Sequence, residues 1–410
     1  MKKFSIVGIY SMIHCIVDMA CAILIAGILT PTLTGTNSLI IAIFLYNLFA
    51  FAFQLPFGIL ADKINKNALI SAIGCVFVII AYCVNSFGIL ACIIAGIGNA
   101  LFHVGGGIDV LNISDKKATL PGIYVATGAM GLYIGSKSIY LGIDKFYIIA
   151  IILAISAVSL FWLYKQVKEK YKINNEVPEF KDIPSKEQII MYCLLITICI
   201  RGYLGLILNF KWKSNFIIGL IVVSAVVLGK ILGGVIGDKF GWKITSTLSL
   251  IFSAILFIFA FDNMICGIVA ILLFNMTMPI TLTALSNMFY KNKGMAFGMT
   301  TIALFIGAVP VLLGYKGFLF DKVSLFIITI ISAVVLYFGL NKYETLEKKN
   351  DWKFNYIGGL NSCNRSNIIF IPWIKRRKEY WNCNLDKLYN ESSCSWNNKS
   401  NLYVITEFDS

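Results

Sequence analysis

Long apolar segments follow one another along most of this chain, and they limit its fold more strictly than any other feature. About a dozen of them occur between residues 4 and 341, most of them 18 residues or longer. A run of this length crosses the hydrocarbon core of a bilayer as a single helix. Only 14% of the residues are charged, against about 25% in soluble domains. The sequence therefore predicts an all-α, multi-pass membrane protein that lies in the lipid bilayer.

The apolar segments are arranged as six spans, a charged linker and six more spans. We expect spans at residues 4–30, 37–60, 67–84, 87–111, 119–136, 146–164, 188–209, 215–236, 244–261, 264–289, 295–314 and 323–341. The first is too long for a cleavable signal peptide and lacks a small-residue cleavage site. The expected domains are an N-terminal six-helix bundle (1–164), a cytoplasmic linker (165–187), a C-terminal six-helix bundle (188–342) and an atypical polar tail (343–410).

The lysines between the spans predict the orientation of the chain. With the N-terminus inside, nineteen lysines fall in inner segments and six in outer loops, which is the bias that the positive-inside rule describes. The N-terminus is therefore expected in the cytoplasm, and the membrane is expected to be the cell membrane of a bacterial-type cell. Because these loops account for most of the net charge of +14, nucleic acid is not expected as a partner.

The eleven cysteines show no pattern of metal ligands. Eight are scattered through apolar spans, where cysteine behaves as a small apolar residue. The other three lie in the tail without a neighbouring histidine. A zinc site of the usual kind needs Cys and His at short, regular spacings, so no metal site is predicted.

The two halves of the chain repeat each other. The stretch GILADKINKN, which begins at Gly58, corresponds to GVIGDKFGWK, which begins at Gly234, at an offset of 176 residues. The same offset relates Asp62 to Asp238, Lys63 to Lys239, Asn99 to Asn275 and Gly122 to Gly298. Two equivalent six-span halves are the plan of transporters whose bundles move against each other around a central site.

Each repeated stretch is a short charged turn between two spans. Gly58 has no side chain, so a neighbouring helix can approach it closely. Asp62 is expected near the start of a helix, where the macrodipole stabilises a carboxylate by about 0.3–1 kcal/mol. Asn65 is expected to tolerate left-handed backbone. One copy alone is equally compatible with an ordinary inner loop, whereas two copies in register favour a specialised turn.

The turns resemble the signature of the major facilitator superfamily, G-x-x-x-D-[R/K]-x-G-[R/x]-[R/K], which follows its second and eighth helices. The second copy matches well, and the first has Asn65 in place of a glycine. The resemblance covers residues 1 to about 342 and implies two pseudo-symmetric six-helix bundles with alternating access. It also implies that the turns clasp the halves together on the inner side when the outer side is open. The implied gating residues are Gly58, Asp62, Lys63, Gly234, Asp238 and Lys239.

The fourth and fifth spans carry a narrower likeness. GNALFHVGGG (98–107) and GIYVATGAMGLYIG (122–135) are similar to the fosmidomycin-resistance-like branch, whose fourth helix reads A-L-F-H-P. Val104 stands here in place of the proline. This likeness favours efflux of small polar or anionic compounds, and therefore an antiporter.

Opposite charges occupy equivalent places in the first span of each half. Arg201, the only arginine before the tail, lies within an apolar span, and Asp18 precedes it by an offset of 183. Ionisable residues within spans usually have a function. One hypothesis is that the two charges neutralise each other and fix the contact between the bundles. The other is that Arg201 attracts an anionic substrate group while Asp18 carries a proton, shared with His14 one helical turn earlier.

Other polar residues in the spans are weaker candidates for the substrate and proton pathway. His103, Asn99 and Asn275 are expected either to line the pathway or to serve helix packing. Asp109 is expected at the wet inner end of its span. Lys230 is expected to extend its ammonium group to the inner surface and to stay outside the site.

The predicted function is secondary active transport of a small solute by a monomer, without a bound cofactor and with a proton gradient as the driving force. The sequence has no ATP-binding motif, no Ser/His/Asp set within the spans and no paired carboxylates, so an enzyme is not expected. A metabolite uptake symporter or a uniporter is the alternative within transport, and a membrane sensor is an alternative outside it.

The tail changes composition abruptly at residue 343. It holds three of the four arginines and four of the seven tryptophans, and it lacks helical periodicity. One hypothesis is a polar cytoplasmic extension. The other is that the tail is out of frame, because a one-base shift of A/T-rich codons turns parts of it into apolar runs. No function is assigned to it.

Overall fold

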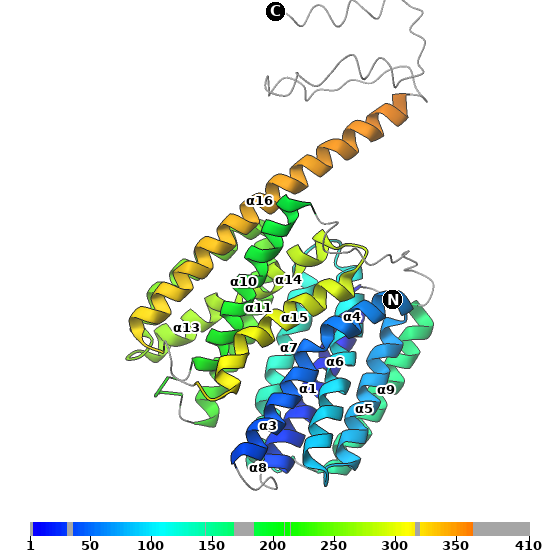
Figure 1. The fold of residues 1–410 in the computed structure, drawn as a ribbon, viewed down its shortest axis with the longest axis vertical. Coiled ribbons are helices and arrows are strands. Elements are labelled where there is room, and N and C mark those ends of the chain that lie inside the picture. The colour runs from blue at the N-terminus through cyan, green and yellow to red at the C-terminus, as the bar shows by residue number, and fades with distance from the viewer. Residues whose placement is uncertain are drawn as a thin grey trace, which may run out of the picture. The chain divides into compact units, whose positions relative to one another are not determined.

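The protein is helical throughout the part that the structure describes. The computed structural model describes residues 3–30, 36–143, 145–167, 184–208, 210–213, 215–315 and 320–363. All regular elements in these residues are helices (Figure 1). A helix satisfies its backbone hydrogen bonds within one segment, which lipid requires because it offers no partners of its own.

The N-terminal half begins with a long helix and keeps the expected order of spans. Its helices are α1 (Lys3–Ala22) continued by the π-helix η1 (Ile23–Leu29), α3 (Thr36–Asn47) continued by the π-helix η2 (Leu48–Ala52) and α4 (Gln54–Ile64), α5 (Asn67–Cys83), α6 (Gly88–Ile113), α7 (Thr119–Ser136), the short α8 (Ser138–Leu141) and α9 (Phe146–Val167). Only α8 was not expected from the sequence.

The C-terminal half follows the same plan. Its helices are α10 (Ser185–Ile207), α11 (Phe216–Phe240), α12 (Trp242–Phe259), α13 (Met264–Asn275) followed by α14 (Thr277–Met288), α15 (Lys293–Leu312) and α16 (Lys322–Cys363). The central part of the linker, residues 168–183, lies outside the described residues.

A helix covers each of the twelve expected spans. Within the described residues, ten helical segments are long and apolar enough to cross a bilayer, and α5 is a shorter apolar helix. The remaining one, α7, has 18 residues and packs against both α1 and α11. The all-α membrane fold is confirmed, while the number of twelve crossings stays a prediction.

Each half has an apolar core of its own. Side chains from α1, α5, α6 and α9 form most of the first, with Val17, Phe102 and Leu153 fully buried in it, and Leu282 and Phe297 of the C-terminal half join it. Side chains from α10, α12 and α14 contribute to the second, including Leu194 and Phe257. Lipid tails are as apolar as these side chains, so close packing rather than the hydrophobic effect holds such helices together.

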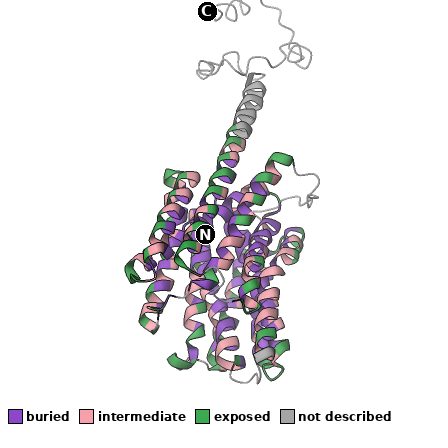
Figure 2. Cartoon of the chain, turned by 60° about the vertical axis from the view of Figure 1, so that its left-hand side comes forward, coloured by how far each residue is buried: buried purple, intermediate pink, exposed green. Residues whose placement is uncertain are grey.

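The outer helices carry apolar side chains on the surface as well. On α9, Leu153 and Leu160 are buried while Tyr147, Ile151 and Val158 are exposed, and Figure 2 shows this mixture of buried and exposed positions along the helices. Exposed apolar area of this extent is unusual for a protein in water. It is the ordinary outer face of a protein in lipid.

The chain divides into two compact units, residues Met1–Glu347 and Lys348–Ser410. The helix α16 begins in the first and ends in the second. The sequence shows no helical periodicity from residue 343 onward, yet α16 continues to Cys363. Residues 364–410, the larger part of the tail, lie outside the described residues, so both hypotheses about the tail stay untested.

Candidate functional site

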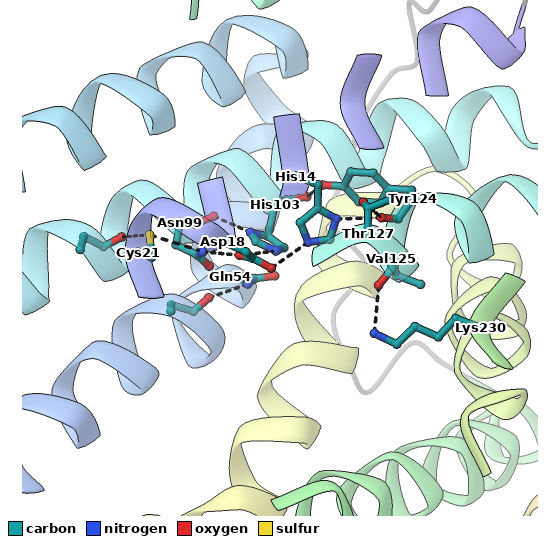
Figure 3. A network of polar contacts seen from close by, with 12 residues as sticks. His14, Asp18, Cys21, Gln54, Asn99, His103, Tyr124, Val125, Thr127 and Lys230 are labelled. Carbon is teal, nitrogen blue, oxygen red and sulfur yellow. Dashed lines mark hydrogen bonds and ion pairs between the residues drawn. The ribbon is translucent and has the colours of Figure 1, made fainter. Parts of the chain in front are cut away.

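A buried carboxylate on α1 collects partners from two helices. Asp18 is 5% exposed, and its carboxylate lies 3.2 Å from Nε2 of His14 and 3.5 Å from Nε2 of His103. Asn99 donates a hydrogen bond of 2.8 Å from Nδ2 to Oδ1 of Asp18. Each helix thus supplies two residues one turn apart, His14 and Asp18 from α1 and Asn99 and His103 from α6 (Figure 3). We call these four residues the Asp18 cluster.

The two imidazole rings of the cluster are held in fixed orientations. Nδ1 of His14 lies 2.8 Å from the carbonyl oxygen of Tyr124, and Nδ1 of His103 lies 2.8 Å from that of Asn99 (Figure 3). A carbonyl can only accept, so Nδ1 carries a hydrogen in both rings. The remaining nitrogen, Nε2, therefore faces the Asp18 carboxylate in both, either as a free lone pair or as a protonated donor.

The backbone of α7 leaves space for this cluster. A Cβ atom placed on Gly128 would overlap both a carboxylate oxygen of Asp18 and Nε2 of His14. The glycine thus allows α7 to pack closely against α1 without displacing the polar groups.

Arg201 lies on α10 at the equivalent place in the other half, and its surroundings are different. It is 7% exposed, and its Nη1 atom donates to the hydroxyl oxygens of Thr281 at 3.2 Å and Thr277 at 3.4 Å, both on α14. Its Nε atom is buried without a hydrogen-bond partner. Within the described residues no carboxylate forms an ion pair with it, so the hypothesis that Asp18 and Arg201 pair directly is not supported.

A third buried charge was misjudged from the sequence. Lys230 on α11 is 8% exposed, and its ammonium group donates to the carbonyl oxygen of Val125 at 3.0 Å (Figure 3). It interacts electrostatically with both Asp18 and Arg201. The expectation that it reaches the inner surface is therefore wrong. Lys230 lies in the middle of an apolar span of the sequence. The same feature identified Arg201 as a candidate and could have identified Lys230 as well.

The remaining candidates lie apart from the Asp18 cluster. Asn275 donates to the carbonyl oxygen of Ile271 in its own helix at 2.8 Å, which fits the packing alternative. Asp109, expected to be wet, is 6% exposed and accepts from Tyr10 at 2.6 Å and Asn67 at 2.8 Å.

The two repeated turns make matching contacts between the halves. Asp62, in the last turn of α4, accepts hydrogen bonds of 2.8 Å from the backbone N–H groups of Gly294 and Met295 at the start of α15. A Cβ atom on Gly58 would overlap the carbonyl oxygen of Gly294. The carboxylate therefore stabilises a helix N-terminus, as expected, but that helix belongs to the opposite half.

The second turn repeats this arrangement with the two halves exchanged. Asp238, near the end of α11, accepts from the N–H groups of Ala118 at 2.9 Å and Thr119 at 2.8 Å, at the start of α7. A Cβ atom on Gly234 would overlap the carbonyl oxygen of Ala118. The side chains of Lys63 and Lys239 are exposed, and among the described contacts neither reaches the opposite half. The gating role of these six residues stays a prediction.

Asn65 ends α4 in a left-handed conformation, with φ 52° and ψ 41°. Gly241 takes a positive φ of 96° at the corresponding place after α11. We expect Asn65→Val to lower the free energy of unfolding by about 1–2 kcal/mol, because a β-branched residue is strained there. Asn65→Gly should leave stability unchanged or raise it. Thermal unfolding of the two variants in detergent measures the difference, and equal melting temperatures would contradict the argument.

Comparisons with known proteins agree with this geometry. The model of the Major Facilitator Superfamily matches residues 7–307. The chain is similar to the solved structure of FucP, a Major Facilitator Superfamily transporter in the outward conformation, with 12% identity and a TM-score of 0.58 over 80% of this chain and 97% of that one. No curated protein matches the sequence.

Two further solved structures are similar to the chain. A variant of the E. coli fucose:proton symporter FucP has 11% identity and a TM-score of 0.58, over 84% of this chain and 99% of that one. The human organic anion transporter MFSD10 has 10% identity and a TM-score of 0.57, over 84% of this chain and 100% of that one. At these identities the likeness concerns the fold alone.

Proposed function

The chain belongs to the major facilitator superfamily, so it is a membrane transporter and not an enzyme, and we propose that it moves a small anionic solute coupled to protons. The observation that carries this proposal is the separation of charge within the membrane-spanning region. Arg201 and Lys230 lie in the C-terminal half, and the Asp18 cluster lies in the N-terminal half.

The two buried cations support an anionic solute. The guanidinium of Arg201 is in contact with neutral hydroxyl groups, and its Nε atom has no partner. Lys230 donates to a neutral carbonyl oxygen. Buried charge without a partner is costly. A carboxylate or phosphate group would accept charge-assisted hydrogen bonds from such donors, and its binding would remove this cost.

The Asp18 cluster supports the coupling to protons. Two imidazole nitrogens face one buried carboxylate at 3.2 and 3.5 Å. With both rings neutral, their lone pairs would point at a negative charge, so a proton is stabilised among the three groups. Histidine and carboxylate chains of this kind carry protons in pumps and transporters.

The sign of the coupling follows from the charges. A proton taken up by the Asp18 cluster adds one positive charge near Lys230, which interacts electrostatically with Asp18 and Arg201. An anion at Arg201 and Lys230 is then bound more tightly, and by linkage the bound anion favours protonation equally. Cooperative binding of this kind supports uptake by symport. It disfavours the efflux antiport suggested by the narrower likeness, because antiport requires proton and solute to compete.

We expect the affinity for the anion to rise as the pH falls, by roughly 5–150-fold across the transition if the coupling is typical. A thermal-shift screen of inorganic phosphate, small carboxylates and small phosphonates on the purified protein would identify a ligand, and calorimetry from pH 5 to 8 would measure its affinity. Tighter binding at high pH would instead indicate competition and restore the efflux antiporter.

The same measurement tests the anion site. We expect Arg201→Gln to weaken binding by about 2–5 kcal/mol, the usual cost of removing one partner of a buried charge pair. The matched control is Lys211→Gln, which removes an exposed positive charge and should leave the affinity unchanged. If both variants bind like the wild type, Arg201 does not contact the solute.

A further inference from the structure

The Asp18 cluster has a geometry that a proton alone does not require. His14, Asp18 and His103 each offer a ligand atom, and these atoms lie within 4.8 Å of one another (Figure 3). The distances from the Asp18 carboxylate to the two Nε2 atoms are 3.2 and 3.5 Å. Ligand atoms that hold a tetrahedral metal ion at 2.0–2.1 Å lie roughly 3.3 Å apart. Only a small closing movement of the two imidazoles is needed for both to reach one ion.

The groups around the three ligands match those of metal-binding histidines. Both rings donate Nδ1–H to a backbone carbonyl, of Tyr124 and Asn99 respectively, and metal-bound imidazoles are commonly oriented by a backbone carbonyl in this way. The Asp18 carboxylate is held in turn by a hydrogen bond from Asn99. The site is therefore preorganised on rigid helices rather than on a loop.

We propose that His14, Asp18 and His103 form a binding site for a divalent transition-metal ion. Two neutral imidazole nitrogens and one carboxylate suit Zn²⁺, Fe²⁺ or Co²⁺ better than Mg²⁺ or Ca²⁺, which prefer oxygen ligands. Three protein ligands leave at least one position open for water or a solute group. The inference goes beyond the proposed function. It rests on the positions of the three ligand atoms and would hold whether or not the protein couples transport to protons.

Binding changes no oxidation state. The metal ion takes the place of whatever protons the two Nε2 atoms and the carboxylate hold, and these protons are released to solvent. Metal and proton are therefore competitors at one site, and a bound metal ion would block the proposed proton coupling.

Lys230 is a buried positive charge that donates to the carbonyl oxygen of Val125 and interacts electrostatically with Asp18 and His103. A positive charge at this place weakens the binding of a cation. The same charge strengthens the binding of an anion in the proposed function. Removal of Lys230 therefore has opposite effects on the two ligands, which separates the two proposals.

Equilibrium dialysis of the purified full-length protein against Co²⁺, with metal analysis and visible absorption, tests the site. We expect each molecule of the wild type to bind one more Co²⁺ ion than each molecule of the His14→Gln or His103→Gln variant. Each variant should lose more than roughly tenfold in affinity, since even outer-sphere changes cost about 10–100-fold. All variants keep the eleven cysteines, so binding by thiols is the same in each.

Two further variants distinguish a metal site from a structural effect. Lys230→Met should bind Co²⁺ more tightly than the wild type, because the variant lacks the positive charge that repels the cation. Tyr82→Phe removes only the hydroxyl that donates to the carbonyl oxygen of Ala20 at 2.6 Å, outside the three ligands, and should bind like the wild type. Equal Co²⁺ binding by the wild type and both histidine variants overturns the proposal and leaves proton coupling intact. If one Co²⁺ ion binds but the anion affinity does not depend on pH, the metal site stands and the proposed proton coupling is overturned.

Discussion

Asp18→Asn is expected to abolish solute accumulation driven by a pH gradient in proteoliposomes, while exchange of solute down its own gradient continues. The asparagine keeps the shape of the side chain and the hydrogen bond accepted from Asn99, but it cannot bind a proton. In the wild type the carboxylate oxygens lie 3.2 and 3.5 Å from the Nε2 atoms of the two imidazoles. Without this negative charge, the cluster no longer stabilises a shared proton. Uptake of the radiolabelled anion with and without a pH gradient measures the coupling directly.

A second buried carboxylate provides the control for this experiment. Asp109 on α6 is as deeply buried as Asp18, but it accepts from Tyr10 and Asn67 and lies outside the cluster. Asp109→Asn should retain coupling to the pH gradient. Full gradient-driven uptake by Asp18→Asn, or loss of coupling in both variants, would remove the specific role of Asp18.

Gly58→Leu is expected to stop transport almost completely by preventing contact between the two halves on the inner side. A Cβ atom at this position already overlaps the carbonyl oxygen of Gly294, and backbone cannot move aside as a flexible side chain can. The carboxylate of Asp62 would then lose the N–H groups of Gly294 and Met295. We expect faster hydrogen exchange at these two amides together with loss of transport.

The repeat supplies both a replicate and a control for this variant. Gly234→Leu should have the same effect on the amides of Ala118 and Thr119, which bind Asp238. Gly8→Leu on α1 meets no atom within 4 Å of its added Cβ and should transport normally. Wild-type transport by Gly58→Leu would show that the turns are loops without a gating role.

The sequence predicted the turns better than it predicted their partners. A glycine, an aspartate and a residue tolerant of left-handed backbone recur at fixed spacing, and the structure uses Gly58 for a close helix contact and Asn65 at φ 52°. The aspartates, however, do not cap their own following helices. Asp62 binds α15 and Asp238 binds α7, a pairing across more than a hundred residues that no local pattern contains.

For the buried charged residues too, the sequence predicted the neighbours within one helix but not the partners from other helices. His14 and Asp18 could be placed side by side from the sequence because four residues make one helical turn. The approach of His103 and Asn99 from α6 depends on how α1 and α6 pack. The position of Lys230 against Val125, rather than at the inner surface, depends on how α11 and α7 pack.

The sequence by itself determined that this protein is a helical membrane transporter with two related halves, because apolar length, lysine placement and repeated turns are local properties of the chain. Only the tertiary structure decided which charges meet. Asp18 contacts two histidines instead of Arg201, and each turn stabilises a helix of the opposite half. The reason is physical: in lipid the helices form from local sequence, but their contacts depend on side-chain packing between segments far apart in the chain.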